Sequence, residues 1–222
     1  MFRIVLMATG DIAVPMVREL LAGPHQVVAV VTQPDKPVGR KQEMLIGPVK
    51  ACALAARVPV LDLPRVACLN LHASLLPRHR GAAPIQAAID SGDTHTGVDV
   101  MYMDEGLDTG DVLLSCRTEI LREETGGELH DRLGAMAPGA LGEALRLLER
   151  GEAPRVRQDG AFATYAGKLE REDGWIDWSR GAESVVRRIR AYEPWPGSFF
   201  WMPGQGGALT KCKVFDAVVG EG

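Results

Sequence analysis

The amino-terminal residues alternate between apolar runs and a helical pattern. Residues 2–8 form an apolar run that ends in a Thr-Gly pair, which predicts a buried strand followed by a tight turn. Asp11 then stands as a helix N-cap before the apolar periodicity of residues 12–21. Gln26–Val31 has the pattern of a second buried strand. Together these elements predict a right-handed strand–helix–strand unit.

The same alternation continues through the first two thirds of the chain. A loop rich in Pro and Gly, residues 32–48, leaves the carboxyl end of the second strand, where open α/β sheets bind ligands. Beyond it, the pattern predicts helices at 48–57, 83–91 and 128–150, and strands at 65–71, 97–103 and 111–117. The predicted fold class is α/β, a Rossmann-like fold with a mostly parallel sheet.

The pattern changes character near residue 151. Residues 1–151 carry the strand and helix periodicity, and residues 152–170 are linker-like, with a proline and scattered charges. Residues 171–222 are rich in Trp, Pro and Gly, with short β-prone runs. We expect a first domain at 1–151, a linker at 152–170 and the start of a second, β-rich domain at 171–222.

Composition favours a folded protein without a membrane span. Apolar residues make up 46% of the chain, which is enough for a sizeable core. No stretch approaches the roughly 18 uninterrupted apolar residues of a membrane helix. The four cysteines lie far apart without a Cys-x-x-Cys pair, so we expect reduced thiols, a cytoplasmic location and no metal site. We expect a monomer.

The charge is distributed unevenly. The net charge is −4 for the whole chain, yet residues 34–80 carry +5 and residues 81–222 carry −9. Two interpretations remain open: ordinary variation of surface charge, or a basic surface that faces phosphates.

One pair of side chains follows the third predicted strand. Asn70 and His72 point to the same side because strand side chains alternate. A loop shaped by Gly and Pro follows at once, and its leucines, Leu75 and Leu76, would suit a flat ring ligand if exposed. An Asn-x-His pair alone is more often structural than catalytic.

A second cluster is acidic. Residues 103–111, MDEGLDTGD, lack the ligand spacing and closing glutamate of an EF-hand, which disfavours calcium. One buried carboxylate from this loop beside His72 would orient the imidazole for acid–base chemistry.

These two clusters carry a family resemblance. Residues 70–86, NLHASLLPRHRGAAPIQ, and 96–114, TGVDVMYMDEGLDTGDVLL, are very similar to the core of the 10-formyltetrahydrofolate-dependent formyltransferase family. By motif, the resemblance implies the catalytic residues Asn70, His72 and Asp108. It also implies folate contacts from Ser74, Leu75, Leu76 and Pro77.

Two further stretches resemble the methionyl-tRNA branch of that family, namely residues 32–40, TQPDKPVGR, and 188–197, RIRAYEPWPG. The resemblance implies formyl transfer from 10-formyltetrahydrofolate to the α-amine of methionyl initiator tRNA, in translation initiation, without a metal. It also implies that the basic loop binds the tRNA acceptor end through Lys36, Arg40 and Lys41. Gln42 and Glu43 follow where the family usually has further basic residues, which predicts a weaker interaction with tRNA.

The resemblance also implies a mechanism. Asn70 and His72 would bracket the formyl oxygen and stabilise the oxyanion, and Asp108 would set the ionisation of His72 and help to move the amine proton. Two alternatives stay open. The chain is a formyltetrahydrofolate hydrolase that uses the same trio with water, or it is an inactive remnant with at most weak folate or tRNA binding.

The sequence departs from the family in two places. Relatives carry a helix and a buried strand, about three dozen residues, between the segments that here end near Arg57 and begin near Arg65, so the first domain is shortened near residues 60–61. Seven residues are too few for a parallel crossover. We therefore expect a gap in the sheet beside residues 66–71, or a rearranged or loosely packed sheet there, and little or no formyl transfer by this polypeptide. The chain also ends within what resembles the start of the family's C-terminal β-barrel domain, which predicts a truncated second domain.

Overall fold

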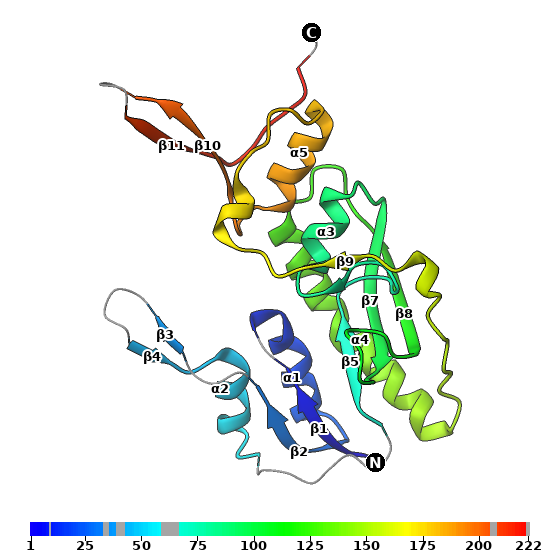
Figure 1. The fold of residues 1–222 in the computed structure, drawn as a ribbon. Helices are drawn as coiled ribbons and strands as arrows, with labels where there is room; N and C mark the ends of the chain where they lie inside the picture. Colours follow the sequence, from blue (N-terminus) through cyan, green and yellow to red (C-terminus); the bar gives the residue numbers. More distant parts are fainter. Residues whose placement is uncertain (9, 33–35, 39–42, 59–66, 205–207, 221–222) are drawn as a thin grey trace.

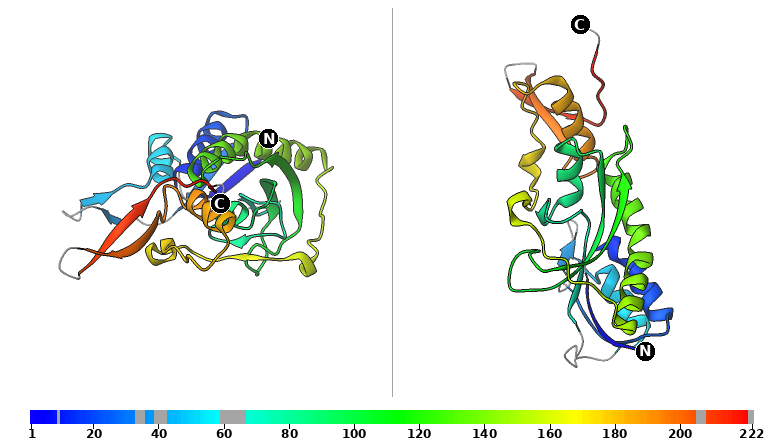
Figure 2. Two further views of the ribbon diagram at one scale, coloured as in Figure 1. Left: turned by 90° about the horizontal axis from the view of Figure 1, so that it is seen from above. Right: turned by 90° about the vertical axis from the view of Figure 1, so that its right-hand side faces the viewer.

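A computed structural model describes the whole chain apart from residues 9, 33–35, 39–42, 59–66, 205–207 and 221–222. Figure 1 shows three groups of elements: an amino-terminal group at the lower left, a central group on the right and a carboxyl-terminal group at the top. Figure 2 shows the same chain from above and from the side, where it is elongated.

The amino-terminal group contains the predicted strand–helix–strand unit. Strand β1 (Arg3–Met7) pairs in parallel with β2 (Gln26–Val31), and α1 (Val14–Ala22) connects them. Asp11 does not cap α1 as predicted: it begins the 3-10 turn η1 (Asp11–Ala13), and Ala13 is the N-cap residue, without a side-chain cap bond. Three buried side chains of α1, those of Met16, Val17 and Leu20, cover this sheet.

The predicted loop 32–48 contains a β-hairpin. Strands β3 (Lys36–Val38) and β4 (Glu43–Leu45) pair antiparallel. Figure 1 shows this hairpin projecting from the amino-terminal group beside α2 (Pro48–Ala55). The sequence did not predict these two short strands, because the Pro and Gly residues of the segment are typical of loops.

The central sheet consists of β5 (Leu69–His72), β7 (His95–Tyr102) and β8 (Val112–Glu119), in that order. Both pairings are antiparallel, whereas the sequence predicted mostly parallel strands. A short loop joins β7 to β8, and only an antiparallel pair can be connected so directly. Helix α3 (Pro84–Asp90) and the short strand β6 (Arg80–Gly81) lie between β5 and β7 in the chain. The α/β class is thus confirmed, with a parallel amino-terminal pair and an antiparallel centre.

Helix α4 (Gly126–Arg150) holds the two groups together. It begins with a capping box between Thr125 and Glu128 and ends at Gly151, which has the left-handed φ of 71°. Its buried residues belong to both core clusters, Leu133 to the central one and Leu141 to the amino-terminal one. Each face of the helix therefore serves a different sheet.

The sheet is interrupted where the sequence predicted a gap. Among the described residues, β1 pairs only with β2, and β5 pairs only with β7, so no hydrogen-bonded ladder joins the two sheets. A cavity of about 510 Å³ separates β1 from β5. This finding confirms the expected gap beside residues 66–71, of which 65 and 66 lie outside the described residues.

The carboxyl-terminal group follows the chain past the η2 turn (Gly160–Phe162), the short strand β9 (Tyr165–Ala166) and the η3 turn (Arg171–Gly174). Helix α5 (Ala182–Ala191) packs on α3, and β10 (Ser198–Pro203) pairs antiparallel with β11 (Leu209–Val214). A small cluster of Ile176, Val185 and Ile189 forms its core. The proposed domain limits at 151 and 171 stay a prediction.

Candidate active site

His72 ends β5 and lies almost completely buried, with 5% of its surface exposed. Its Nε2 is 2.9 Å from the carbonyl oxygen of His79. Because a carbonyl oxygen only accepts, Nε2 carries a proton and donates it. The other ring nitrogen, Nδ1, lies 3.7 Å from Oδ2 of Asp108. That separation exceeds a hydrogen bond, so among the described residues no hydrogen bond engages Nδ1, which can act on a substrate while a carboxylate lies beside it.

Asp108 is held in place by hydrogen bonds from two other segments. Its Oδ2 accepts a hydrogen bond from the Gly81 amide at 2.8 Å, and its carbonyl oxygen accepts one from Nε2 of Gln158 at 2.8 Å. Gln158 in turn accepts two hydrogen bonds from the guanidinium of Arg80, at 2.7 and 3.1 Å. Asp108 also has a φ of +53°, which a non-glycine residue adopts only when its surroundings enforce it. The carboxylate is therefore positioned before a ligand arrives.

Asn70 lies two residues before His72 on the same strand, and both residues line the cavity between β1 and β5. In the part of the chain that the structure describes, no hydrogen bond engages the Asn70 side chain. Its amide is therefore available to a ligand as a donor. The structure brings His72 and Asp108 together and places Asn70 on the adjoining cavity wall. The catalytic role of all three stays a prediction.

The predicted folate segment forms the loop after β5. Ser74 is fully buried, and its hydroxyl donates a 2.7 Å hydrogen bond to the carbonyl of Arg78. Leu75, Leu76 and Pro77 are half-buried, so the two leucines are less exposed than the sequence suggested. The inward-facing part of Leu75 packs against Gly97, where a Cβ would lie 2.8 Å from the leucine methyl group. Folate binding by this loop stays a prediction.

Asp99 supports this loop and was not identified from the sequence. It lies opposite His72 in the β5–β7 pairing, it is fully buried, and its Oδ2 accepts a 2.7 Å hydrogen bond from the Leu76 amide. Burial raises the pKa of Asp99 to about 6, against the lowering effects of the nearby Ser115 hydroxyl and of the hydrogen bond from the Leu76 amide. Its Oδ1 has no hydrogen-bond partner among the described residues. A lone Asp within an otherwise apolar strand was the available signal.

The pKa of Asp99 makes stability depend on pH. The folded chain binds more protons than the unfolded chain between pH 3.8 and about 6, so stability falls as pH rises through that window. A shift of this size costs about 3 kcal/mol once the group is ionised. We expect Asp99→Asn, whose amide oxygen still accepts from Leu76, to raise the free energy of unfolding at pH 7.5 but not at pH 4.

Urea unfolding at both pH values measures this effect. The exposed Asp131 on α4 gives the control Asp131→Asn, which should leave the pH dependence unchanged. An Asp99→Asn variant with the pH dependence of the parent chain would contradict the assignment.

Gln158 is the other residue that sequence reasoning missed. Besides Asp108, its Nε2 donates to the carbonyl of Gly110 at 2.8 Å, so it fixes both ends of a short stretch of the acidic loop. It lies in the segment predicted to be a linker, about 50 residues along the chain from Asp108 and Gly110, whose carbonyl groups it binds. An isolated glutamine in such a segment carries no sequence signal, because the contact depends on the fold.

The predicted tRNA residues lie in or beside the β3–β4 hairpin. Lys36 begins β3, but its side chain is outside the described residues, as are Arg40 and Lys41 altogether. Within the described ranges, no cluster of three or more His, Cys, Asp or Glu side chains is placed to hold a metal ion. No helix among them is long and apolar enough to cross a membrane.

Comparison with known proteins gives the same family for both halves of the chain. The formyl transferase family matches residues 51–145, and the formyl transferase C-terminal domain family matches residues 168–222. The methionyl-tRNA formyltransferase of Akkermansia muciniphila is 43% identical over 249 residues, covering 96% of this chain and 79% of the relative.

Two solved structures share the fold. The methionyl-tRNA formyltransferase from Clostridium thermocellum has a TM-score of 0.60 and 16% identity, covering 96% of this chain and 99% of the other. The N-formyltransferase from Helicobacter canadensis, solved in complex with folinic acid and dTDP-3-aminofucose, has a TM-score of 0.68 and 17% identity. It covers 86% of this chain and 80% of the other.

The length of the Akkermansia alignment shows that the relative has residues that this chain lacks. It spans 249 positions but includes only 96% of the 222 residues of this chain, so about three dozen positions hold residues of the relative alone. That number equals the expected size of the missing helix and strand. With both domain families matched and most of a 43% identical relative covered, the chain belongs to the methionyl-tRNA formyltransferase family.

Proposed function

We propose that this chain transfers the formyl group of 10-formyltetrahydrofolate to the α-amine of methionyl initiator tRNA, with Asn70, His72 and Asp108 as its catalytic residues. The observation that supports this most is the His72–Asp108 pair. One ring nitrogen of His72 is anchored to a carbonyl oxygen, and the other lies 3.7 Å from a positioned carboxylate. The family of the chain supplies the reaction class.

The reaction needs one bond to form and one to break. The lone pair of the neutral amine attacks the formyl carbon, a carbon–nitrogen bond forms, and the carbonyl oxygen becomes negatively charged. The bond from that carbon to the folate nitrogen then breaks, and the proton lost by the amine ends on that nitrogen. Donors that face the charged oxygen each contribute on the order of 3 kcal/mol to such a step.

The structure suggests how the three side chains divide this work. The Asn70 amide donates to the charged oxygen, since no other hydrogen bond engages it among the described residues. His72 acts through Nδ1, because its Nε2 is already bonded to His79. When both ring nitrogens carry protons, the imidazolium can donate a hydrogen bond from Nδ1 to the same oxygen, and the nearby Asp108 carboxylate balances the positive charge of that ring. No step requires a metal.

The formyl donor belongs to the folate class, in keeping with the family and with the folinic acid bound by the Helicobacter protein. The loop after β5 is the proposed contact for the flat folate ring, through the half-buried side chains of Leu75, Leu76 and Pro77. Ser74 would act by shaping this loop, because its hydroxyl is bonded to Arg78.

An assay that follows a labelled formyl group separates the possible activities. The chain, in excess over labelled 10-formyltetrahydrofolate, is mixed with methionyl initiator tRNA, and label is measured in the tRNA and in free formate. We expect slow transfer to the tRNA and little formate. Release of formate at the same rate without tRNA would identify a hydrolase, and label in neither product would identify a remnant.

The tRNA interaction gives a separate prediction. Arg40→Ala should weaken tRNA binding severalfold at 100 mM salt and reduce the slope of log K against log salt by about 1, because one phosphate contact is lost. Filter binding across a salt series measures both quantities. Arg18→Ala on the exposed side of α1 is the charge-matched control. Equal effects of the two variants would argue against a specific role for this loop.

The monomeric state and the cytoplasmic location remain expectations. Size-exclusion chromatography with light scattering tests the first, and fractionation of the source cells tests the second.

A further inference from the structure

Two strand edges that face the same cavity have no strand paired with them among the described residues. Strand β1 uses one edge to pair with β2, and β5 uses one edge to pair with β7. Within the described parts of the chain, neither strand pairs with a third. Each free edge presents a row of backbone amide and carbonyl groups, which is a template for another strand.

The cavity between these edges is apolar on most sides. Its lining comes from β1, α1, β5 and α4, and includes the side chains of Leu6, Met16, Leu71, Leu133 and Leu141. Asn70 and His72 are polar residues of the β5 wall, and Arg3 is the one charged residue of the β1 wall. A volume of about 510 Å³ is far more than a single ordered water needs.

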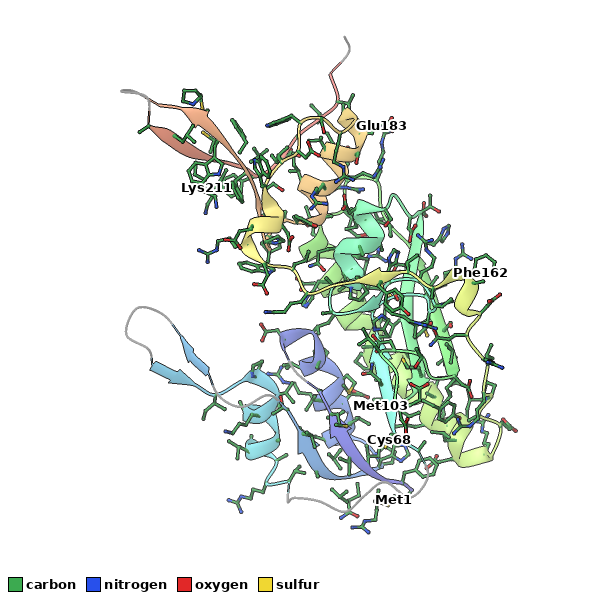
Figure 3. The ribbon with its side chains drawn as sticks, in the orientation of Figure 1. Met1, Cys68, Met103, Phe162, Glu183 and Lys211 are labelled. Atoms are coloured by element: carbon green, nitrogen blue, oxygen red, sulfur yellow. The ribbon has the colours of Figure 1, made fainter. Side chains whose placement is uncertain are left out.

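The two edges run in the same direction. Figure 3 labels Met1 and Cys68, which lie just before β1 and β5, at the same end of the molecule. A strand inserted between them would therefore be parallel to both. It would join the β1–β2 pair to the β5–β7–β8 sheet and be buried on both faces, as the interior strands of α/β sheets are.

We propose that the space between β1 and β5 is an acceptor site for one extended, apolar peptide strand supplied by a second polypeptide. Backbone groups on two sides can be satisfied together only by another backbone, and this favours a peptide over a small apolar molecule. The four- and five-residue lengths of β5 and β1 fix the core of the strand at about five residues. The apolar lining excludes charged side chains from that core.

The comparisons are in keeping with this inference. The family relative has about three dozen positions that this chain lacks, which is enough for the absent strand and its helix. The proposal concerns binding at a sheet edge and does not depend on the proposed catalytic activity.

The test uses the purified 222-residue chain and a synthetic peptide. The peptide has a five-residue Val and Ile core, Lys at both ends for solubility, and capped termini. Hydrogen exchange followed by mass spectrometry should show at least tenfold slower exchange for peptide fragments that contain β1 and β5, and the melting temperature should rise with peptide concentration. Slower exchange confined to β2 or β8, the outer strands, would overturn the proposal, because the peptide would then occupy another edge.

A second peptide separates strand pairing from simple filling of the cavity. It has the same side chains, but alternate backbone nitrogens are methylated, which removes donors along one edge. We expect it to bind at least tenfold more weakly. Equal binding would show that the cavity accepts apolar groups regardless of backbone, and the acceptor-strand proposal would be wrong.

Two variants block the site from opposite walls. Ala137→Trp adds a large side chain from α4, and Ala67→Trp adds one before β5; both parent residues line the cavity. A variant that unfolds cooperatively is folded and should lose peptide binding. If Ala137→Trp does not fold, Ala67→Trp provides the test. Unchanged binding in a folded variant would contradict the location. Concentration-dependent dimerisation of the parent chain, competed by neither peptide, would assign the space to a second copy instead.

Discussion

Replacing His72 by alanine should lower the rate constant of formyl transfer by about 1,000-fold or more, while folate affinity changes less than about threefold. The physical reason is that His72 acts on charge that develops only in the transition state, so its loss affects turnover more than binding. The comparison uses single-turnover rates with the chain in excess and folate binding measured by fluorescence or calorimetry.

His95→Ala is the matched control for that variant. His95 is an exposed histidine at the start of β7, and its Nδ1 lies 3.0 Å from the hydroxyl of the neighbouring Thr94. Its replacement should leave both quantities unchanged. A parallel loss of folate affinity and rate in the His72 variant would mean that the residue holds the pocket together and does not act on the reacting atoms.

Restoring the missing segment should have the second large effect. A chain in which the helix and strand of a relative are inserted after Val58 should transfer formyl groups about 100-fold faster, since displacement of catalytic groups by about 1 Å has a cost of that order. Here β5, which carries Asn70 and His72, has no neighbouring strand on its β1 side among the described residues. The insertion should also raise the melting temperature by at least about 10 °C by filling the cavity.

An insertion of equal length made from Gly and Ser is the control for that chain. It restores the length of the connection without a strand, so it should improve neither rate nor stability. Ordinary turnover by the 222-residue chain, equal to that of the restored chain, would show that the gap is tolerated.

The parts of the fold that could be predicted are those that local pattern determines. The apolar run of β1, the periodicity of α1 and the second run of β2 lie next to one another, so their parallel pairing followed directly. The gap beside β5 was expected from the family resemblance, because the seven residues between Arg57 and Arg65 are too few to hold the helix and strand that relatives carry there. The direction of β5 relative to β7 was not, because side-chain alternation is the same in parallel and antiparallel strands.

The candidate site, like the fold, was predictable only in part. The pairing of His72 with a carboxylate of the acidic loop followed from the motifs, and the two side chains lie 3.7 Å apart. The support given by Gln158 and Asp99 did not, because each depends on contacts between segments far apart in the sequence. The hairpin of β3 and β4 was missed because the Pro and Gly residues of that segment are typical of a loop.

The most direct test of the central claim, that His72 and Asp108 act together on the formyl group, is a double-mutant cycle on the single-turnover rate. His72→Ala, Asp108→Ala and the double variant are compared with the parent chain, with formylated methionyl-tRNA as the measured product. We predict that the double variant is about as slow as His72→Ala alone, because a carboxylate that acts through the imidazole has no effect once the imidazole is gone. Two single losses that multiply in the double variant would show that His72 and Asp108 act independently, and joint action would be wrong.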